Sequence, residues 1–398
     1  MRAGAFLYPW DVVADPAAAD RVAELGVAQA TLASAYHSTR ALTPRHRLHR
    51  IVTARHSAVY YPPDEARWAG RRLRPHRQSW VLGDDPFGEA AERLAAAGVE
   101  PHSWVILAHN SQVGGEHPQS TVVSATGDRY PWALCIARPE VREYAATLAA
   151  EAAVRPGAAG VELESCGWYG LDHLHAHDKI GGASLGPVGG QLMSLCFCGV
   201  CRDGYAEHGA DPMELREAVV RALAPFWSGR DRPAPPVRDA EWAAVVELVG
   251  EELAAAAAGW RTAVARAFQR EMVAAVRAAA PAGFRVLLHA EPDWFRLGAN
   301  VGVDPADVLA HADGVVVPAT GDDAARSATL GPFVPHLGPG ATLAANFQVV
   351  AGMGGRPHEL AADAAHAAAL GATELRLYHA GLATTDDLDA VREALAKL

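Results

Sequence analysis

One pattern recurs along the chain: an alanine-rich stretch with helical spacing, then a glycine, then a short apolar run. Examples are "AAAGVEPHSWVILAHN", "RPGAAGVELES" and "ALGATELRLYHA". Glycine is favoured just past the end of a helix, and a strand can begin directly after it. With "AGAFLYPW" at the start, the pattern predicts eight strands, centred on Phe6, Thr31, Val105, Val161, Val286, Val316, Leu343 and Leu375.

Helical patterns lie between most of these strands, for example "DPFGEAAERLAAA" and "PEVREYAATLAAEAA". Eight alternations of strand and helix predict an α/β fold, a (β/α)8 TIM barrel formed by residues 1–398 as a single domain. The alternative is an open doubly wound sheet, which usually has a glycine-rich phosphate-binding turn after its first strand. The stretch "FLYPWDVVADP" contains no glycine, which favours the barrel.

Two long segments interrupt the alternation. Residues 34–80 follow the second strand and are expected to cover the mouth of the barrel. Residues 165–236 follow the fourth strand, and we expect this insertion to form a lid that carries a histidine run and a cysteine cluster. After "RPAPP", one long helical stretch over residues 238–280 leads to the fifth strand.

The formal net charge of −11 over 398 residues argues against nucleic acid or an anionic membrane as the main partner. No apolar run approaches the roughly 20 residues that a membrane-spanning helix needs. The start, "MRAGAFLYPWDVV", is broken too early by Pro9 to resemble a signal peptide. Five cysteines, three of them clustered, fit a reducing compartment better than a disulfide framework. We therefore expect a cytoplasmic protein; the sequence does not indicate its oligomeric state.

The predicted strand ends are unusually polar, and in a TIM barrel the active site lies at the carboxyl ends of the strands. Any single polar residue there could simply close a turn. Polar residues gather at the strand ends and not at the strand starts, which predicts a binding site. The residues concerned are Tyr8, Tyr36, His37, His109, Asn110, Glu162, Glu164, His289, Glu291, Asn346, Gln348, Tyr378 and His379.

Two glutamates mark the end of the fourth strand. Glu162 and Glu164 are two positions apart, so both side chains point to the same side of the strand. A carboxylate buried under the helices would be costly without a partner, which favours the barrel lumen for both. Glu291, at the end of the neighbouring fifth strand, is the natural second carboxylate beside Glu164. Two carboxyl groups that face one cavity are what glycosidic bond cleavage requires.

The stretch "ARPEVREYAATLAAEAA…GVELES" resembles barrel-type glycoside hydrolases, in which a similar helix precedes a strand that ends in an acidic residue. The stretch "GWYGLDHLHAHDKIG…LMSLCFCGVC" is similar, more narrowly, to alanine-rich actinobacterial barrel proteins grouped loosely with those hydrolases. The resemblance covers most of residues 100–300 and implies a barrel that acts on sugars. The large retaining clan has its nucleophile on strand 7, where this chain has Asn346, Phe347 and Gln348.

The stretch "CFCGVC" places Cys196, Cys198 and Cys201 within one tight turn. Thiolates at this spacing can share one Zn²⁺ in tetrahedral geometry, and a fourth ligand must come from elsewhere. Cys166 or a histidine of "HLHAHD" is the expected donor. A structural zinc is the favoured reading; buried thiols without metal and a redox or catalytic use are the alternatives.

The histidines of the insertion alternate in sequence. His173, His175 and His177 would share one face of an extended segment, either as a polar loop or as a strip that faces substrate or metal. Lys179 follows, one of only two lysines in the chain. Trp168 lies near a predicted strand end, where an indole suits sugar stacking as well as ordinary packing.

These patterns favour a glycoside hydrolase-like enzyme that acts on a sugar or sugar-containing small molecule. A metal-dependent hydrolase or lyase with His and Glu ligands, and a non-catalytic carbohydrate-binding barrel, remain open alternatives. The expected catalytic residues are Glu164 and Glu291. The expected substrate-binding residues are Tyr8, His37, His109, Asn110, Glu162, Trp168, His175, Lys179, His289, Asn346 and Tyr378.

Overall fold

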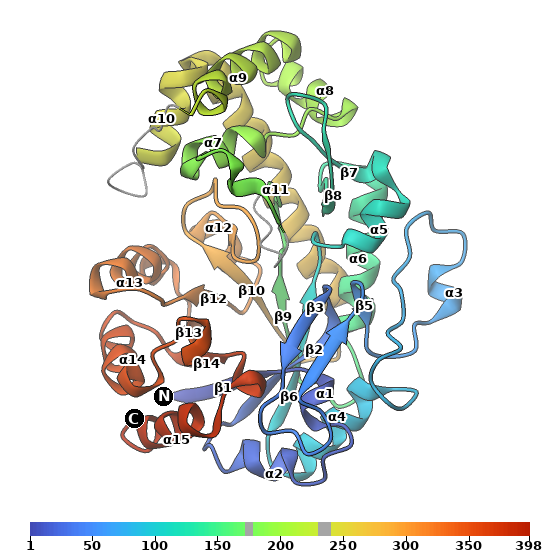
Figure 1. Ribbon diagram of the computed structural model, residues 1–398, viewed down its shortest axis with the longest axis vertical. Helices are drawn as coiled ribbons and strands as arrows, with labels where there is room; N and C mark the ends of the chain where they lie inside the picture. The colour runs from blue at the N-terminus through green and yellow to red at the C-terminus, as the bar shows by residue number, and fades with distance from the viewer. Residues whose placement is uncertain (172–177, 230–239) are drawn as a thin grey trace.

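Eight parallel strands close into a barrel in the computed structural model, which describes residues 1–171, 178–229 and 240–398 (Figure 1). The first strand pairs with both the second and the last, which closes the sheet. Each of the eight predicted segments forms one of these strands, so the predicted barrel is confirmed. The strands are β1 (Arg2–Leu7), β2 (Gln29–Tyr36), β6 (Glu100–Ile106), β9 (Gly160–Glu164), β10 (Arg285–Glu291), β12 (Gly314–Pro318), β13 (Thr342–Gln348) and β14 (Glu374–Tyr378).

Helices surround the barrel and explain why its strands are apolar on both faces. Every residue of β2 and β9 is buried, as expected for parallel strands covered by helices. None of the described helices combines the length and the hydropathy that a membrane-spanning segment needs. The covering helices are α2 (Ala18–Ala23), α4 (Pro86–Ala96), α6 (Pro139–Ala153), α11 (Glu251–Ala279), α12 (Pro305–Leu309), α13 (Asp323–Leu330), α14 (Leu360–Ala369) and α15 (Thr385–Leu395).

Glycines end these helices as the sequence pattern indicates. Gly98 after α4 and Gly371 after α14 have positive φ angles of 82° and 99°, the left-handed conformation that glycine adopts without strain. Gly250 has a φ of 100° and divides the stretch predicted as one helix over 238–280. That stretch contains two helices, α10 (Ala240–Val249) and α11.

Two short hairpins stand above the barrel strands. Segment 34–80 contains a hairpin of β3 (Thr39–Leu42) and β4 (Ile51–Ala54), then β5 (Ala58–Val59), which pairs antiparallel with β2, and α3 (Glu65–Trp68). After β6 the chain forms α5 (Ser111–Glu116) and a second hairpin of β7 (Thr121–Val123) and β8 (Arg129–Leu134). The second hairpin has no counterpart among the predicted elements.

The chain between β9 and β10 forms a group of helices at one end of the molecule (Figure 1). These helices are α7 (Gly186–Met193), α8 (Gly199–Glu207), α9 (Pro212–Trp227) and α10, which pack on one another and beside α11. Residues 172–177 and 230–236 of the predicted insertion lie outside the described residues. Its boundaries at 165–236 and its function as a lid therefore stay predictions.

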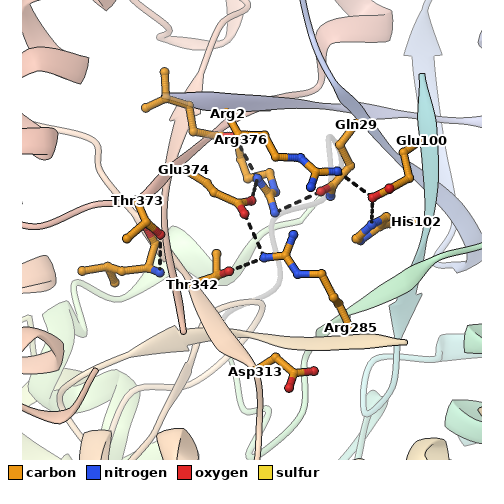
Figure 2. A network of polar contacts seen from close by, with 12 residues as sticks. Arg2, Gln29, Glu100, His102, Arg285, Asp313, Thr342, Thr373, Glu374 and Arg376 are labelled. Carbon is orange, nitrogen blue, oxygen red and sulfur yellow. Dashed lines mark hydrogen bonds and ion pairs between the residues drawn. The ribbon is translucent and has the colours of Figure 1, made fainter. Parts of the chain in front are cut away.

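A network of buried charges fills the lower part of the barrel, at the amino ends of the strands (Figure 2). Arg376, which is fully buried, donates from Nε to Oε1 of Glu162 at 2.6 Å and from Nη1 to Oε2 of Glu374 at 2.9 Å. Gln29 donates to the same oxygen of Glu162 at 3.0 Å. Arg285 extends the network by donating to Oε1 of Glu374 at 2.8 Å. Side chains from opposite strands thus meet across the lumen, directly beneath the site described next.

Candidate active site

A cavity of about 650 Å³ lies at the carboxyl ends of the barrel strands. Its walls come from the ends of β1, β2, β9 and β14, from the β3–β4 hairpin and from the loops after β13 and β14. The size falls in the range of roughly 300–1,000 Å³ that is common for small-molecule sites. Its polar lining includes Tyr8, Tyr36, His37, His109, Glu164, Ser165, Tyr169, Tyr378 and His379.

Glu164 lies at the carboxyl end of β9 and lines this cavity. Its Oε2 accepts a hydrogen bond from the indole Nε1 of Trp104 at 2.8 Å, and the hydroxyl of Tyr378 also donates to the carboxylate. Nδ1 of His289 lies 3.6 Å from the same Oε2. Burial raises the pKa of Glu164, and the contacts with His289, Trp104 and Tyr378 offset only part of that rise. The group therefore holds its proton to higher pH than an ordinary glutamate.

Two aromatic hydroxyls and an imidazole form one wall. The hydroxyl of Tyr8 lies 3.0 Å from that of Tyr36 and 2.9 Å from Nδ1 of His379. Burial raises the pKa of both tyrosines well above the usual range. Burial and the nearby His37 lower the pKa of His379 to about 3. This wall is consequently uncharged near neutral pH and offers hydrogen bonds without a competing ion.

Two non-glycine residues of the lining have left-handed backbone conformations. Ser165, directly after Glu164, has a φ of 53°, and His379, directly after Tyr378, has a φ of 61°. Such conformations are disfavoured for residues with a Cβ and often occur at functional sites. Both residues turn the chain out of a barrel strand at the cavity.

Gly381 supports the wall from behind, which gives a first testable prediction. An added Cβ at Gly381 would overlap the carboxylate of Asp11, whose Oδ2 accepts from the backbone N–H of Tyr8 at 2.8 Å. We expect Gly381→Ala to lower the free energy of unfolding by about 1–3 kcal/mol, the usual range for overpacking. Gly331→Ala is the matched control, because its added methyl meets no atom within 4 Å. Urea denaturation compares the two variants, and equal stabilities would contradict this account of Gly381.

Five of the expected site residues line the cavity: Tyr8, His37, His109, Glu164 and Tyr378. Glu162 does not. Both glutamates face the lumen, but Glu162 lies one layer lower, is fully buried and binds Arg376 and Gln29. Burial raises its pKa, yet Arg376 and His289 more than compensate and hold the pKa well below the usual range. The carboxylate of Glu162 thus belongs to the buried network, and its expected contact with substrate stays a prediction.

His289 also lies below the cavity. Its Nε2 is 3.6 Å from Oε2 of Glu162, and its Nδ1 is equally far from Oε2 of Glu164. The imidazole is buried and is absent from the described lining. His289 therefore lies between the two glutamates, and its expected contact with substrate stays a prediction.

Two further residues that were expected to bind substrate make structural contacts. Asn110 caps α5: its Oδ1 accepts from the N–H of Val113 at 3.0 Å, and its Nδ2 donates to Tyr144. The indole of Trp168 donates to the carbonyl of Arg261 at 2.9 Å and lies under that guanidinium. Both side chains are buried and neither lines the cavity, so their expected contacts with substrate stay predictions.

Three expected residues that the structure describes do not line this cavity, and a fourth is not described. Asn346 is buried at the end of β13, Lys179 is exposed before α7, and neither lines the cavity. Glu291 is half-buried where β10 pairs with β11 (Val301–Gly302), and it is absent from the described lining. The catalytic assignment of Glu291 stays a prediction. His175 lies outside the described residues.

The cysteine cluster has a different fourth member from the one expected. Sulfurs of Cys196, Cys198 and Cys201 meet that of Cys135, and ligand atoms of all four lie within 4.8 Å of one another. Cys166 is buried elsewhere and is not part of the group. Cys135 precedes Cys196 by 61 residues, whereas Cys166 is nearer in sequence. The histidines His173, His175 and His177, the other expected donors, lie outside the described residues. Only the β7–β8 hairpin, which the sequence did not predict, brings Cys135 into position.

Several lining residues were not expected. Tyr169 stacks on His109 with ring centroids 4.5 Å apart. Trp104 does not line the cavity itself, but its ring contacts those of Tyr8, Tyr36 and Tyr378. Thr39, Arg40, Ala41 and Leu42 come from the β3–β4 hairpin, in the segment expected to cover the mouth. Their apolar and polar alternation resembles any exposed hairpin, so no sequence signal separates them from ordinary loop residues.

Comparisons with known proteins identify the fold. No family model and no curated protein sequence matches this chain. Among solved structures, the PgaB (BpsB) glycoside hydrolase domain from Bordetella bronchiseptica has a TM-score of 0.58 at 15% identity, over 99% of this chain and 98% of that one. The catalytic domain of β-amylase from Paenibacillus polymyxa has a TM-score of 0.52 at 11% identity, over 99% and 97%.

Alpha-L-fucosidase isoenzyme 2 from Paenibacillus thiaminolyticus has a TM-score of 0.54 at 13% identity. All of this chain aligns with 49% of that protein, so the chain spans about half the length of the fucosidase. Identities this low establish the fold alone. The chain has the (β/α)8 barrel fold of these glycoside hydrolases.

Proposed function

We propose that this protein is a glycoside hydrolase-like enzyme in which Glu164 donates a proton to the glycosidic oxygen. The observation that carries the proposal is the position of Glu164: a buried carboxyl with a raised pKa, at the carboxyl end of β9, on a cavity of about 650 Å³. A carboxyl that holds its proton to higher pH than an ordinary glutamate suits the protonation of a leaving sugar oxygen. The fold shared with glycoside hydrolases supports this reaction class.

The surroundings of Glu164 fit such a proton donor. Burial and the proximity of Glu162 raise its pKa, while Trp104 and Tyr378 hold its oxygens in place by hydrogen bonds. The aromatic lining of Tyr8, Tyr36 and Tyr169 suits stacking and hydrogen bonding with a sugar ring. As the C–O bond breaks, the proton of Glu164 would pass to the leaving oxygen, and water would complete the hydrolysis.

Glu291 remains the candidate for the second carboxylate, as base or nucleophile. The alternative of a metal-dependent hydrolase or lyase has less support. Within residues 1–171, 178–229 and 240–398, the cysteine cluster is the one group with the spacing of metal ligands. The histidines of the cavity lining, His37, His109 and His379, form no such group among the described residues.

A panel of chromogenic aryl glycosides, varied in sugar and in anomeric configuration, tests the proposed activity. Wild-type protein is compared with Glu164→Gln, with Glu291→Gln and with Glu92→Gln, an exposed glutamate on α4 that serves as control. We expect turnover of at least one glycoside, its loss in Glu164→Gln and its retention in Glu92→Gln. Loss in Glu291→Gln as well would assign the second carboxylate.

Other outcomes favour the alternatives. Sugar binding in calorimetry with no turnover across the panel would indicate a carbohydrate-binding barrel. Two tightly bound metal ions per chain, with turnover that depends on the second, would indicate metal-dependent chemistry. Full turnover by Glu164→Gln would refute the assigned proton donor.

A further inference from the structure

Four buried sulfurs meet at a point between the β7–β8 hairpin and α8. Sγ of Cys135 lies 3.7 Å from those of Cys196 and Cys201 and 3.8 Å from that of Cys198. All four cysteines are free and buried. A disulfide would need sulfurs about 2.05 Å apart, so the group is not a pair of bonded cystines.

The distances match a tetrahedral metal site. With Zn–S bonds of about 2.3 Å, the edges of a regular tetrahedron of sulfurs are about 3.8 Å long. The three edges that begin at Cys135 have almost this length. Four cysteine sulfurs gathered around one point, all within 4.8 Å of one another, form the ligand set that such a site requires.

The surroundings suit a negatively charged centre. Four thiolates around one Zn²⁺ carry a net charge of −2, which needs donors and cations nearby. The backbone N–H of Val123 points at Sγ of Cys196 at 3.4 Å, and the side chain of Arg138 donates to Cys198. Arg261 is buried next to the group, and its neighbours there include Cys135, Cys196 and Cys201. A tetrathiolate centre would supply a negative charge beside this guanidinium.

We propose that Cys135, Cys196, Cys198 and Cys201 bind one Zn²⁺ as a closed structural site. Four protein ligands leave no open position for substrate or water, so the metal would stabilise the fold and would not perform chemistry. It would join the end of β8 to the first turn of α8, with Cys198 as the N-cap of that helix.

The site would also support the cavity wall. β8 carries Trp132, whose carbonyl accepts from Nδ1 of His109 at 2.8 Å, and whose indole donates to the carbonyl of Gly170. His109 in turn stacks on Tyr169 in the lining. The metal thereby fixes the strand that holds this side of the cavity, whatever reaction the cavity supports.

Metal analysis of the reduced, untagged protein tests the site, with Cys135→Ser and Cys166→Ser as a matched pair. Both substitutions change a buried thiol to a hydroxyl, but only Cys135 belongs to the group. We expect one zinc per chain in wild type and in Cys166→Ser, and its loss with a lower thermal midpoint in Cys135→Ser. Replacement by Co²⁺ should give the visible absorption of a tetrahedral cobalt thiolate.

The cobalt spectrum of wild-type protein keeps the test decisive if Cys135→Ser does not fold. Wild-type protein that holds no zinc and takes up no cobalt would overturn the site. Stoichiometric zinc in folded Cys135→Ser, or its loss in Cys166→Ser, would overturn the ligand set. None of these measurements depends on glycosidase activity.

Discussion

Replacing Arg376 with methionine is expected to lower the free energy of unfolding by about 3–5 kcal/mol, the usual effect of removing one partner from a buried ion pair. Arg376 is fully buried and neutralises Glu162 and Glu374 at 2.6 and 2.9 Å. Without the guanidinium, the carboxylate of Glu162 would remain in the lumen with only Gln29 and His289 as polar neighbours.

The pH dependence of this effect has a definite sign. In wild type, the folded pKa of Glu162 is depressed, so its contribution to stability is present above the unfolded glutamate pKa and is lost as pH falls. In Arg376→Met, burial without the cation should raise the pKa of Glu162. Protonation of Glu162 at lower pH should then remove the cost of burying an unpaired carboxylate. The difference in stability between the two proteins should therefore shrink from pH 7 towards pH 4.

Urea denaturation at several pH values measures both quantities. Arg392→Met is the control, because Arg392 forms an exposed pair with Asp389 and such pairs contribute about 0–1 kcal/mol. A double variant, Arg376→Met with Glu162→Gln, should recover stability relative to Arg376→Met alone. A loss below 1 kcal/mol in the single variant would show that the buried network does not hold the barrel together.

Glu164→Gln should reduce kcat on a glycoside substrate by about 10²-fold or more, since an amide cannot act as the general acid. The shape of the site should persist, because Gln can still accept from Nε1 of Trp104. The activity of wild type should fall as pH rises through the raised pKa of Glu164, where the donor loses its proton.

The variant Tyr378→Phe tests whether Glu164 acts as the general acid or has only a structural role. The hydroxyl of Tyr378 donates to Glu164 and lowers its pKa, so removing it should move the alkaline fall of kcat/KM to higher pH. Glu92→Gln should leave the whole pH profile unchanged. An alkaline limb that stays in place in Tyr378→Phe would assign that limb to another group.

The sequence predicted the barrel well because its signals are local. Runs such as Gly-Val-Val-Val in β12 are buried on both faces, and glycines mark the helix ends at Gly98 and Gly371. The rule that active sites lie at the carboxyl ends of barrel strands also found Tyr8, His109 and Glu164. The β7–β8 hairpin was not predicted. The sequence of β8, "RYPWAL", is short and contains a proline, which argues against a strand.

The expected site residues that do not line the cavity share a physical cause. Asn110 and Trp168 lie near strand ends, but their polar groups already have hydrogen-bond partners. The side chain of Asn110 accepts from a helix N–H, and the indole of Trp168 donates to a backbone carbonyl. Glu162 has the same sequence context as Glu164, yet it meets Arg376, which lies 214 residues later. The sequence does not show which distant partner a polar group will find.

The charge network at the foot of the barrel has a consequence for how the chain folds. The partners Glu162 and Arg376 are 214 residues apart, and Gln29 and Glu162 are 133 apart. Contacts of this sequence separation raise the contact order, and loop closure must precede them, which slows folding. Before β14 docks between β13 and β1, an incomplete barrel has Glu162 in its lumen without its counter-ion. A barrel that lacks β14 would therefore be destabilised from within, so we expect the eight strands to form cooperatively.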